Sequence, residues 1–167
     1  MKTFFKFLFI TVLAASINFN GEAQNEKIKT AFLYQFSRYI QWPAQNSSFV
    51  YGVYGDGPIY NALANMAKTR SGSSQNFKVV KITNLDDALN CNILFVTDQI
   101  NDIDAVKQTI GKSPTLVVSE KDGFGKKGSE INFTNKQGKL RFELNTKSAE
   151  EKGLMVSGEL KNLAILL

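Results

Sequence analysis

The sequence contains no histidine, and this absence limits the chemistry that the chain could perform. Among its 167 residues, Cys91 is the one cysteine. The common serine and cysteine hydrolase triads need a histidine base, and histidine and cysteine are the usual ligands of zinc. We therefore expect no catalytic residue, no metal site and no cofactor, and we predict that the protein is not an enzyme.

Acidic residues follow a predicted buried strand and could in principle hold a cation through oxygen. They are Asp98, Asp102 and Asp104. A simpler interpretation is that Asn101 or Asp102 caps a helix that begins at Ile103, with Asp104 in its first turn. We favour this structural role.

A glycine-rich turn, Gly55-Asp56-Gly57-Pro58, lies between a predicted strand and a predicted helix. Such turns can bind phosphate at a helix N-terminus, but this one lacks a third glycine and Asp56 would repel an anion. We expect a tight turn capped by Asp56. If the protein instead senses a small ligand, the crevice should lie at the carboxyl ends of parallel strands, near Gly55, Asp56 and Asp98.

Aromatic residues are more frequent around the first predicted helix than one core-facing stripe requires. Tyrosine, tryptophan and arginine are enriched at protein interfaces. We therefore predict a partner-binding surface made of Tyr34, Arg38, Tyr39 and Trp42. Packing in the core is the alternative, above all for Trp42.

A predicted C-terminal hairpin carries a second candidate surface. Arg141, Glu143 and Asn145 alternate with apolar residues and should share a polar face, which either orders the hairpin or meets a partner. Lysines near the hairpin could meet an anionic membrane or an acidic partner, although an ordinary solvated surface explains them too. They are Lys126, Lys127, Lys136 and Lys139. The remaining lysines are scattered along the chain, so we expect no nucleic-acid partner.

The elements that must position these residues alternate between strands and helices. This pattern predicts an α/β three-layer sandwich with a largely parallel central sheet, a C-terminal β-hairpin and terminal helices. The predicted helices are 26–41, 58–68, 85–89, 103–110, 147–152 and 159–167, and the predicted strands are 49–54, 77–82, 92–97, 115–119, 130–134 and 140–144.

Residues 1–23 have the order of a secretory signal peptide: two lysines, an apolar run from Phe7 to Ala15, and small residues up to Ala23. The run is too short to span a membrane. We predict cleavage after Ala23, a single domain over 24–167 and no membrane span after cleavage. Cys91 should be buried, or else it could form a bridge between chains.

Five segments of the chain, with three residues near its end, resemble the YfiR-like family of periplasmic proteins. They are the opening helix Lys29–Pro43, the strand and turn Val53–Pro58, and the closing segments 128–133, 140–145 and 153–157 with Leu160, Leu163 and Ala164. The resemblance implies a periplasmic α/β sandwich that can dimerise. It also implies regulation, because the family's namesake inhibits an inner-membrane diguanylate cyclase, an enzyme of cyclic-di-GMP signalling. The namesake has cysteine pairs, so its disulfide cannot be carried over to a chain whose one cysteine is Cys91.

These observations lead to one main functional hypothesis and one alternative. The main hypothesis is a non-enzymatic periplasmic regulator that binds an inner-membrane signalling protein with a periplasmic domain, either a diguanylate cyclase or a sensor kinase. A homodimer is also possible on this hypothesis. The alternative is a periplasmic sensor of a small ligand.

Overall fold

The computed structural model describes residues 20–44, 47–72 and 75–167. Most of the predicted signal peptide, residues 1–19, lies outside the described residues. The predicted cleavage site after Ala23 falls in the first turn of helix α2 (Asn20–Tyr39). No helix among the described residues is long and apolar enough to cross a membrane.

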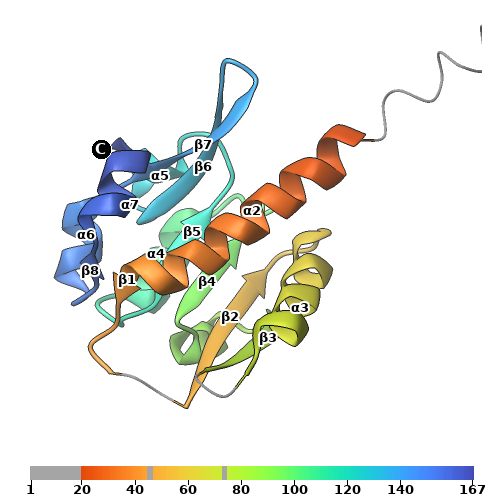
Figure 1. The fold of residues 1–167 in the computed structure, drawn as a ribbon. Coiled ribbons are helices and arrows are strands. Elements are labelled where there is room, and N and C mark those ends of the chain that lie inside the picture. Colours follow the sequence, from red (N-terminus) through yellow and green to blue (C-terminus); the bar gives the residue numbers. More distant parts are fainter. Residues whose placement is uncertain (1–19, 45–46, 73–74) are drawn as a thin grey trace, which may run out of the picture.

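A seven-stranded sheet forms the centre of the molecule, with the strand order β3-β2-β4-β5-β6-β7-β9 (Figure 1). Strands β3, β2, β4, β5 and β6 run parallel, whereas β7 is antiparallel to β6. The prediction of a largely parallel sheet with a C-terminal hairpin is thus confirmed. The strands are β2 (Ser48–Tyr54), β3 (Asn76–Ile82), β4 (Ile93–Val96), β5 (Leu116–Ser119), β6 (Ile131–Lys136), β7 (Lys139–Leu144) and β9 (Ile165–Leu166).

Helices cover both faces of this sheet, as the three-layer prediction requires. One face packs against α2, α3, α6 and α7, and the other packs against η1, α4 and α5. The bounds are α3 (Ile59–Arg70), the 3-10 helix η1 (Leu85–Asn90), α4 (Ile103–Ile110), α5 (Phe124–Lys127), α6 (Thr146–Glu151) and α7 (Gly158–Leu163).

The apolar central strands are buried on both faces. In β4, Ile93 and Phe95 belong to the core under α2, while Leu94 and Val96 belong to the core under α4. Each of these side chains is fully buried. Because successive residues of a strand point to opposite faces, a strand covered on both sides needs an apolar residue at every position.

Helix α2 lies across the sheet and is held by aromatic packing (Figure 1). The buried Phe36 ring lies 5.2 Å from Phe142 and 6.1 Å from Phe133, measured between centroids. The helix ends at Tyr39, and the next two residues form strand β1 (Ile40–Gln41), which pairs with β8 (Met155–Val156). The predicted end of the helix at Gln41 was therefore two residues too late, because the backbone of Ile40–Gln41 pairs with β8 instead of continuing the helix.

The C-terminal segment differs from the prediction of a helix over 159–167. Helix α7 ends at Leu163, and Ile165–Leu166 forms β9, which pairs in parallel with β7. A short apolar run fits either a helix or a strand. Here the run forms a strand because the edge of β7 offers backbone groups for it to pair with. Helix α5 was not predicted at all, because its four residues are too few to show a helical period.

Candidate functional site

The end of α2 brings three of the four predicted partner-binding residues together. Arg38 and Tyr39 are exposed, and Tyr39 keeps 38 % of its surface accessible. The backbone carbonyl of Tyr39 accepts a hydrogen bond from the Ser157 amide at 2.9 Å, which fixes the point where the helix stops. Pro43 then prevents the chain from continuing as a helix.

Trp42 is half-buried and links the end of α2 to the sheet. Its ring meets Phe49 edge-on at 4.9 Å between centroids, and its Nε1 donates a hydrogen bond to the Asn92 carbonyl at 3.3 Å. The Asn92 side chain in turn accepts from the Val50 amide at 2.8 Å. Trp42 is thus anchored to the beginnings of β2 and β4, which supports the core alternative for its ring while its rim stays accessible.

A hollow of about 300 Å³ lies beside these residues, at the amino-terminal edge of the parallel strands. Its lining is a mixture of polar side chains with two aromatic rings, the composition of a protein-binding surface rather than of a dry cavity. The lining residues include Ser37, Arg38, Gln41, Trp42, Ser48, Phe49, Gln75 and Asn92.

Tyr34 does not belong to this hollow. Its ring packs edge-on against Phe77 of β3 at 5.8 Å, and the Arg70 guanidinium lies 4.9 Å from its centroid. Tyr34 therefore joins α2 to α3 and β3, whereas Arg38, Tyr39 and Trp42 form a surface of their own. We call these three residues with the hollow the α2-end surface.

The predicted polar face of the hairpin separates into three structural roles. Arg141 donates to the Leu163 carbonyl at 3.4 Å, and Glu143 accepts from the Asn132 side chain at 3.2 Å. Asn145 caps α6 by accepting from the Ser148 amide at 3.0 Å. Arg141 is exposed, and Glu143 and Asn145 are half-buried. Each of the three has a hydrogen-bond partner within the chain.

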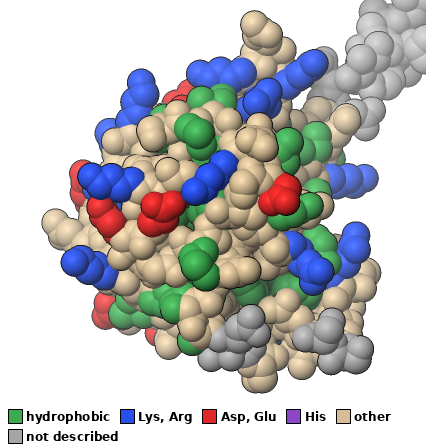
Figure 2. All heavy atoms as spheres, turned by 60° about the vertical axis from the view of Figure 1, so that its left-hand side comes forward, with side chains coloured by type: hydrophobic (Ala, Val, Ile, Leu, Met, Phe, Trp, Pro, Cys, Tyr) green, Lys and Arg blue, Asp and Glu red, His purple; other side chains and the backbone are tan. Residues whose placement is uncertain are grey.

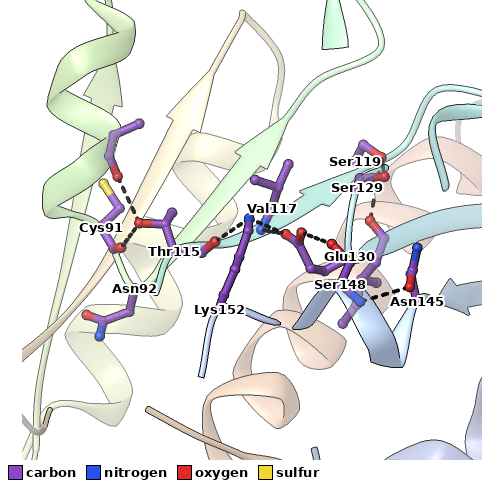
Figure 3. Close-up of polar contacts among 12 residues, drawn as sticks. Cys91, Asn92, Thr115, Val117, Ser119, Ser129, Glu130, Asn145, Ser148 and Lys152 are labelled. Carbon is purple, nitrogen blue, oxygen red and sulfur yellow. Dashed lines mark hydrogen bonds and ion pairs between the residues drawn. The ribbon is translucent and has the colours of Figure 1, made fainter. Parts of the chain in front are cut away.

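A buried ion pair beside this face was missed by the sequence analysis (Figure 3). Glu130 is 1 % exposed and accepts hydrogen bonds from the Lys152 ammonium at 2.9 Å, the Val117 amide at 2.8 Å and the Ser148 hydroxyl at 2.7 Å. Lys152 also donates to the Thr115 carbonyl at 3.1 Å. The pairing of β5 with β6 begins at Val118, so β6 offers no carbonyl to the Val117 amide. The Glu130 carboxylate accepts this hydrogen bond instead.

The predicted ligand crevice lies at the carboxyl ends of β2 and β4, where the strand order changes direction. The Thr97 amide donates to the Tyr54 carbonyl at 3.0 Å, so Gly55 and Asp98 follow neighbouring strand ends. The backbone groups of Asp98 have partners inside the chain: its amide donates to Glu120, and its carbonyl accepts from Lys121. The Thr97 hydroxyl is buried without a partner among the described residues.

Asp56 does not cap the following helix, contrary to the prediction. The N-cap position of α3 is Pro58, which has no side-chain cap, and the Asp56 carboxylate pairs with Lys81 of β3. In contrast, the predicted cap by Asp102 is confirmed, because its side chain accepts from the Ala105 amide at 3.0 Å.

Cys91 is buried, with 5 % of its surface accessible. Burial raises the pKa of its thiol to about 11, and the nearby Asp87 adds to this effect. A thiol that stays protonated is a poor nucleophile and a poor metal ligand. Among the described residues, no three histidine, cysteine or acidic side chains come together as a metal site.

The strand order and the covered sheet define the chain as a doubly wound α/β domain, and the α2-end surface lies at the amino-terminal edge of its parallel strands. The chain belongs to the YfiR/HmsC-like family, which it matches over residues 26–165. YfiR-like proteins are known as periplasmic regulators of signalling. No curated protein matches the chain significantly.

Proposed function

We propose that the protein is a non-enzymatic periplasmic regulator that binds and modulates an inner-membrane signalling protein, a diguanylate cyclase or a sensor kinase. The family membership supports a regulatory role, and the signal-like residues 1–23 support export. The α2-end surface is the proposed contact. The observation that carries the proposal is that the exposed Arg38 and the anchored Trp42 line one hollow, with the exposed Tyr39 next to Arg38 in the chain.

The chemistry of this surface suits recognition. A tyrosine, a tryptophan and an arginine are the side chains most often found at energetic centres of protein interfaces. Trp42 is held by Phe49 and Asn92, so little conformational entropy is lost when a partner covers it. A partner side chain that enters the hollow would meet hydrogen-bonding groups and the aromatic rings of Trp42 and Phe49.

Affinity capture from gently cross-linked cells tests this proposal. The protein should recover an inner-membrane signalling protein with a periplasmic domain. The double variant Arg38→Ala/Tyr39→Ala should reduce this recovery at least tenfold, because loss of a hot-spot side chain costs about 2 kcal/mol or more. The matched control is Lys68→Ala/Val80→Ala, which removes a charge and an exposed apolar side chain from α3 and β3.

Three results decide between the functions. Recovery that falls in the α2-end variant and not in the control supports the regulator. Equal recovery from both variants contradicts the proposed surface. Recovery of no signalling protein, together with a rise in melting temperature on addition of a small ligand, would favour a ligand sensor, since a ligand at a hundred times its dissociation constant stabilises the folded state by about 2.7 kcal/mol.

A further inference from the structure

A basic face with exposed leucines runs along the outer edge of the sheet, away from the α2-end surface. We define the hairpin-edge face as the side of β7 that meets α5, together with the tip of the hairpin and the C-terminal leucines. The cations are Lys126, Lys127, Lys136, Lys139 and Arg141, and the leucines are Leu163, Leu166 and Leu167.

Contacts between the elements place these residues around the same edge of the sheet, beside β7 and β9. Arg141 donates to the Leu163 carbonyl, which joins β7 to the end of α7. A Cβ on Gly125 of α5 would lie 2.5 Å from Glu143 of β7 and 3.0 Å from Leu167, so α5 rests directly on β7 and on the C-terminal residues. Figure 2 shows this side of the molecule, with blue lysine and arginine side chains along its upper part and green hydrophobic ones between them.

The leucines of this face are exposed to an unusual degree. Leu163, Leu166 and Leu167 keep 55 %, 57 % and 46 % of their surfaces accessible, respectively. Leu166 pairs with Leu144 and therefore points to the α2 side of the sheet, whereas Leu167 lies against α5 on the other side. The exposed leucines thus surround the edge of the sheet beside the cations, and several exposed apolar side chains in one region are typical of an interaction surface.

The cations have no acidic partners to neutralise them. None of the four lysines forms an ion pair with another described residue, and Arg141 bonds to a carbonyl. Lys136 and Lys139 are directly opposite each other across the hairpin, and like charges in that arrangement destabilise the strand pair. Glu143, which lies beside Arg141 on β7, is already bonded to Asn132.

We propose that the hairpin-edge face binds an anionic phospholipid surface. Exposed lysines contribute attraction to acidic headgroups, and the leucines between them can enter the interfacial region of the bilayer. An anionic surface also removes the repulsion between Lys136 and Lys139. The β6–β7 hairpin projects beyond the other strands of the sheet (Figure 1), and Lys136 and Lys139 at its tip are exposed.

A fluid lipid surface suits this face better than a shaped acidic protein does. The cations come from α5 and from both strands of the hairpin, and all the lysines are on exposed positions. Lysine side chains are flexible point charges that follow mobile headgroups, whereas geometric recognition of protein carboxylates favours arginine. Binding should therefore depend on the anionic lipid content and fall as salt screens the charges.

Sedimentation with lipid vesicles tests this proposal on the purified protein, as the cell processes it. The probes are vesicles of phosphatidylglycerol mixed with phosphatidylcholine and vesicles of phosphatidylcholine alone. The variants are Lys136→Glu/Lys139→Glu at the hairpin tip and Leu163→Ser/Leu166→Ser at the C-terminal end. The control variant, Lys68→Glu/Lys78→Glu, has the same change of charge on exposed positions of α3 and β3.

The protein should bind the anionic vesicles and not the neutral ones. The hairpin-tip variant should bind at least tenfold more weakly, since each lysine contributes about fivefold, and the leucine variant several-fold more weakly. The control should remain within about twofold, because its lysines are far from the face. All variants have the same N-terminal residues, so any contribution of that segment to binding cancels in the comparison.

Two results would overturn the proposal. Failure to bind anionic vesicles contradicts it directly, and an equal loss in the control would reduce the effect to the general positive charge of +5. If vesicles are not bound but the hairpin-tip variant loses the captured signalling protein, the face binds an acidic protein instead. The α2-end variant should still bind vesicles, so the failure of one proposal is distinguishable from the failure of the other.

Discussion

Single residues stabilise this fold most strongly where a charge is buried, and Glu130 is the clearest case. Its carboxylate joins the amide of Val117, the hydroxyl of Ser148 and the ammonium of Lys152, which is itself 9 % exposed. These groups come from β5, from α6 and from Lys152, the residue that follows α6, so one side chain connects the sheet to the C-terminal part of the chain. Truncation would leave all three of them without their partner in a buried environment.

We predict that Glu130→Ala lowers the free energy of unfolding by about 3–5 kcal/mol. Urea unfolding measures the change. The matched control is Glu150→Ala, which breaks the exposed pair with Lys161 at 3.2 Å and should cost no more than about 1 kcal/mol. Similar small losses in both variants would show that Glu130 is not an important link.

Cys91 gives the stability of the protein a defined pH dependence. The folded state keeps the thiol protonated up to a pKa of about 11, whereas an ordinary cysteine has a pKa of 9.0. Above pH 9.0 the unfolded chain releases the proton and the folded chain retains it, so unfolding releases protons. The free energy of unfolding must then fall as the pH rises from 9.0 to about 11.

We predict that Cys91→Ala removes this part of the pH dependence. The free energy of unfolding, measured by urea titration for both proteins across this range, should differ by an amount that changes with pH. All other titrating groups are shared by the two proteins, so their contributions cancel in the difference. A difference that stays constant with pH would contradict the raised pKa.

At the scale of elements, the turn between β2 and α3 depends on close contact rather than on a ligand. Gly55 has a φ of +99°, and a Cβ at this position would lie 2.0 Å from the Thr97 hydroxyl. We expected a tight turn here, and Gly55 also belongs to the alternative ligand crevice, which the position at the carboxyl ends of parallel strands suggested. The structure shows that the same glycine is needed to bring the ends of β2 and β4 together.

We predict that Gly55→Ala costs about 2–4 kcal/mol of stability, since it adds both steric overlap and backbone strain. Gly158→Ala is the control, because nothing lies within 4 Å of its added Cβ and its φ is ordinary. The control should change stability by less than about 0.5 kcal/mol. Thermal unfolding gives the melting temperature of each variant. Equal melting temperatures for the Gly55 and Gly158 variants would contradict the role of Gly55.

The sequence predicted the regular elements well because their periods are long enough to read. Helix α4 has the predicted bounds, Ile103–Ile110, since Asp102 caps it and Gly111 ends it. Strand β9 and the pair β1–β8 were not predicted, because each strand has two residues and exists only through its neighbour. Such elements depend on tertiary contacts, which no local pattern encodes.

The candidate site was predictable in part, for the same reason. Residue type pointed to Arg38, Tyr39 and Trp42; Arg38 and Trp42 line one hollow, and Tyr39 is exposed at the last position of α2. Tyr34 has the same residue type but packs against Phe77 of β3. Lys152, the partner of Glu130, is 22 residues away in the chain, so no local pattern indicates that the two pair in the core.

At the scale of the whole molecule, the two proposed surfaces lie on different parts of the domain. The α2-end surface is at the amino-terminal edge of the parallel strands, whereas the hairpin-edge face follows β7 at the outer side of the sheet. A regulator that rests on an anionic membrane through the hairpin-edge face would still present the α2-end surface to a membrane protein. The two contacts could then reinforce each other, since the first raises the local concentration for the second.

The most direct measurement of the central claim is site-specific photo-cross-linking in living cells. A photoreactive residue replaces Tyr39 in one protein and Val80 in another, positions that are both 38 % exposed but lie on α2 and on β3. We predict that the position of Tyr39 forms an adduct with an inner-membrane diguanylate cyclase or sensor kinase and that the position of Val80 does not. No adduct at Tyr39, or the same adduct from both positions, would contradict a regulator that binds through the end of α2.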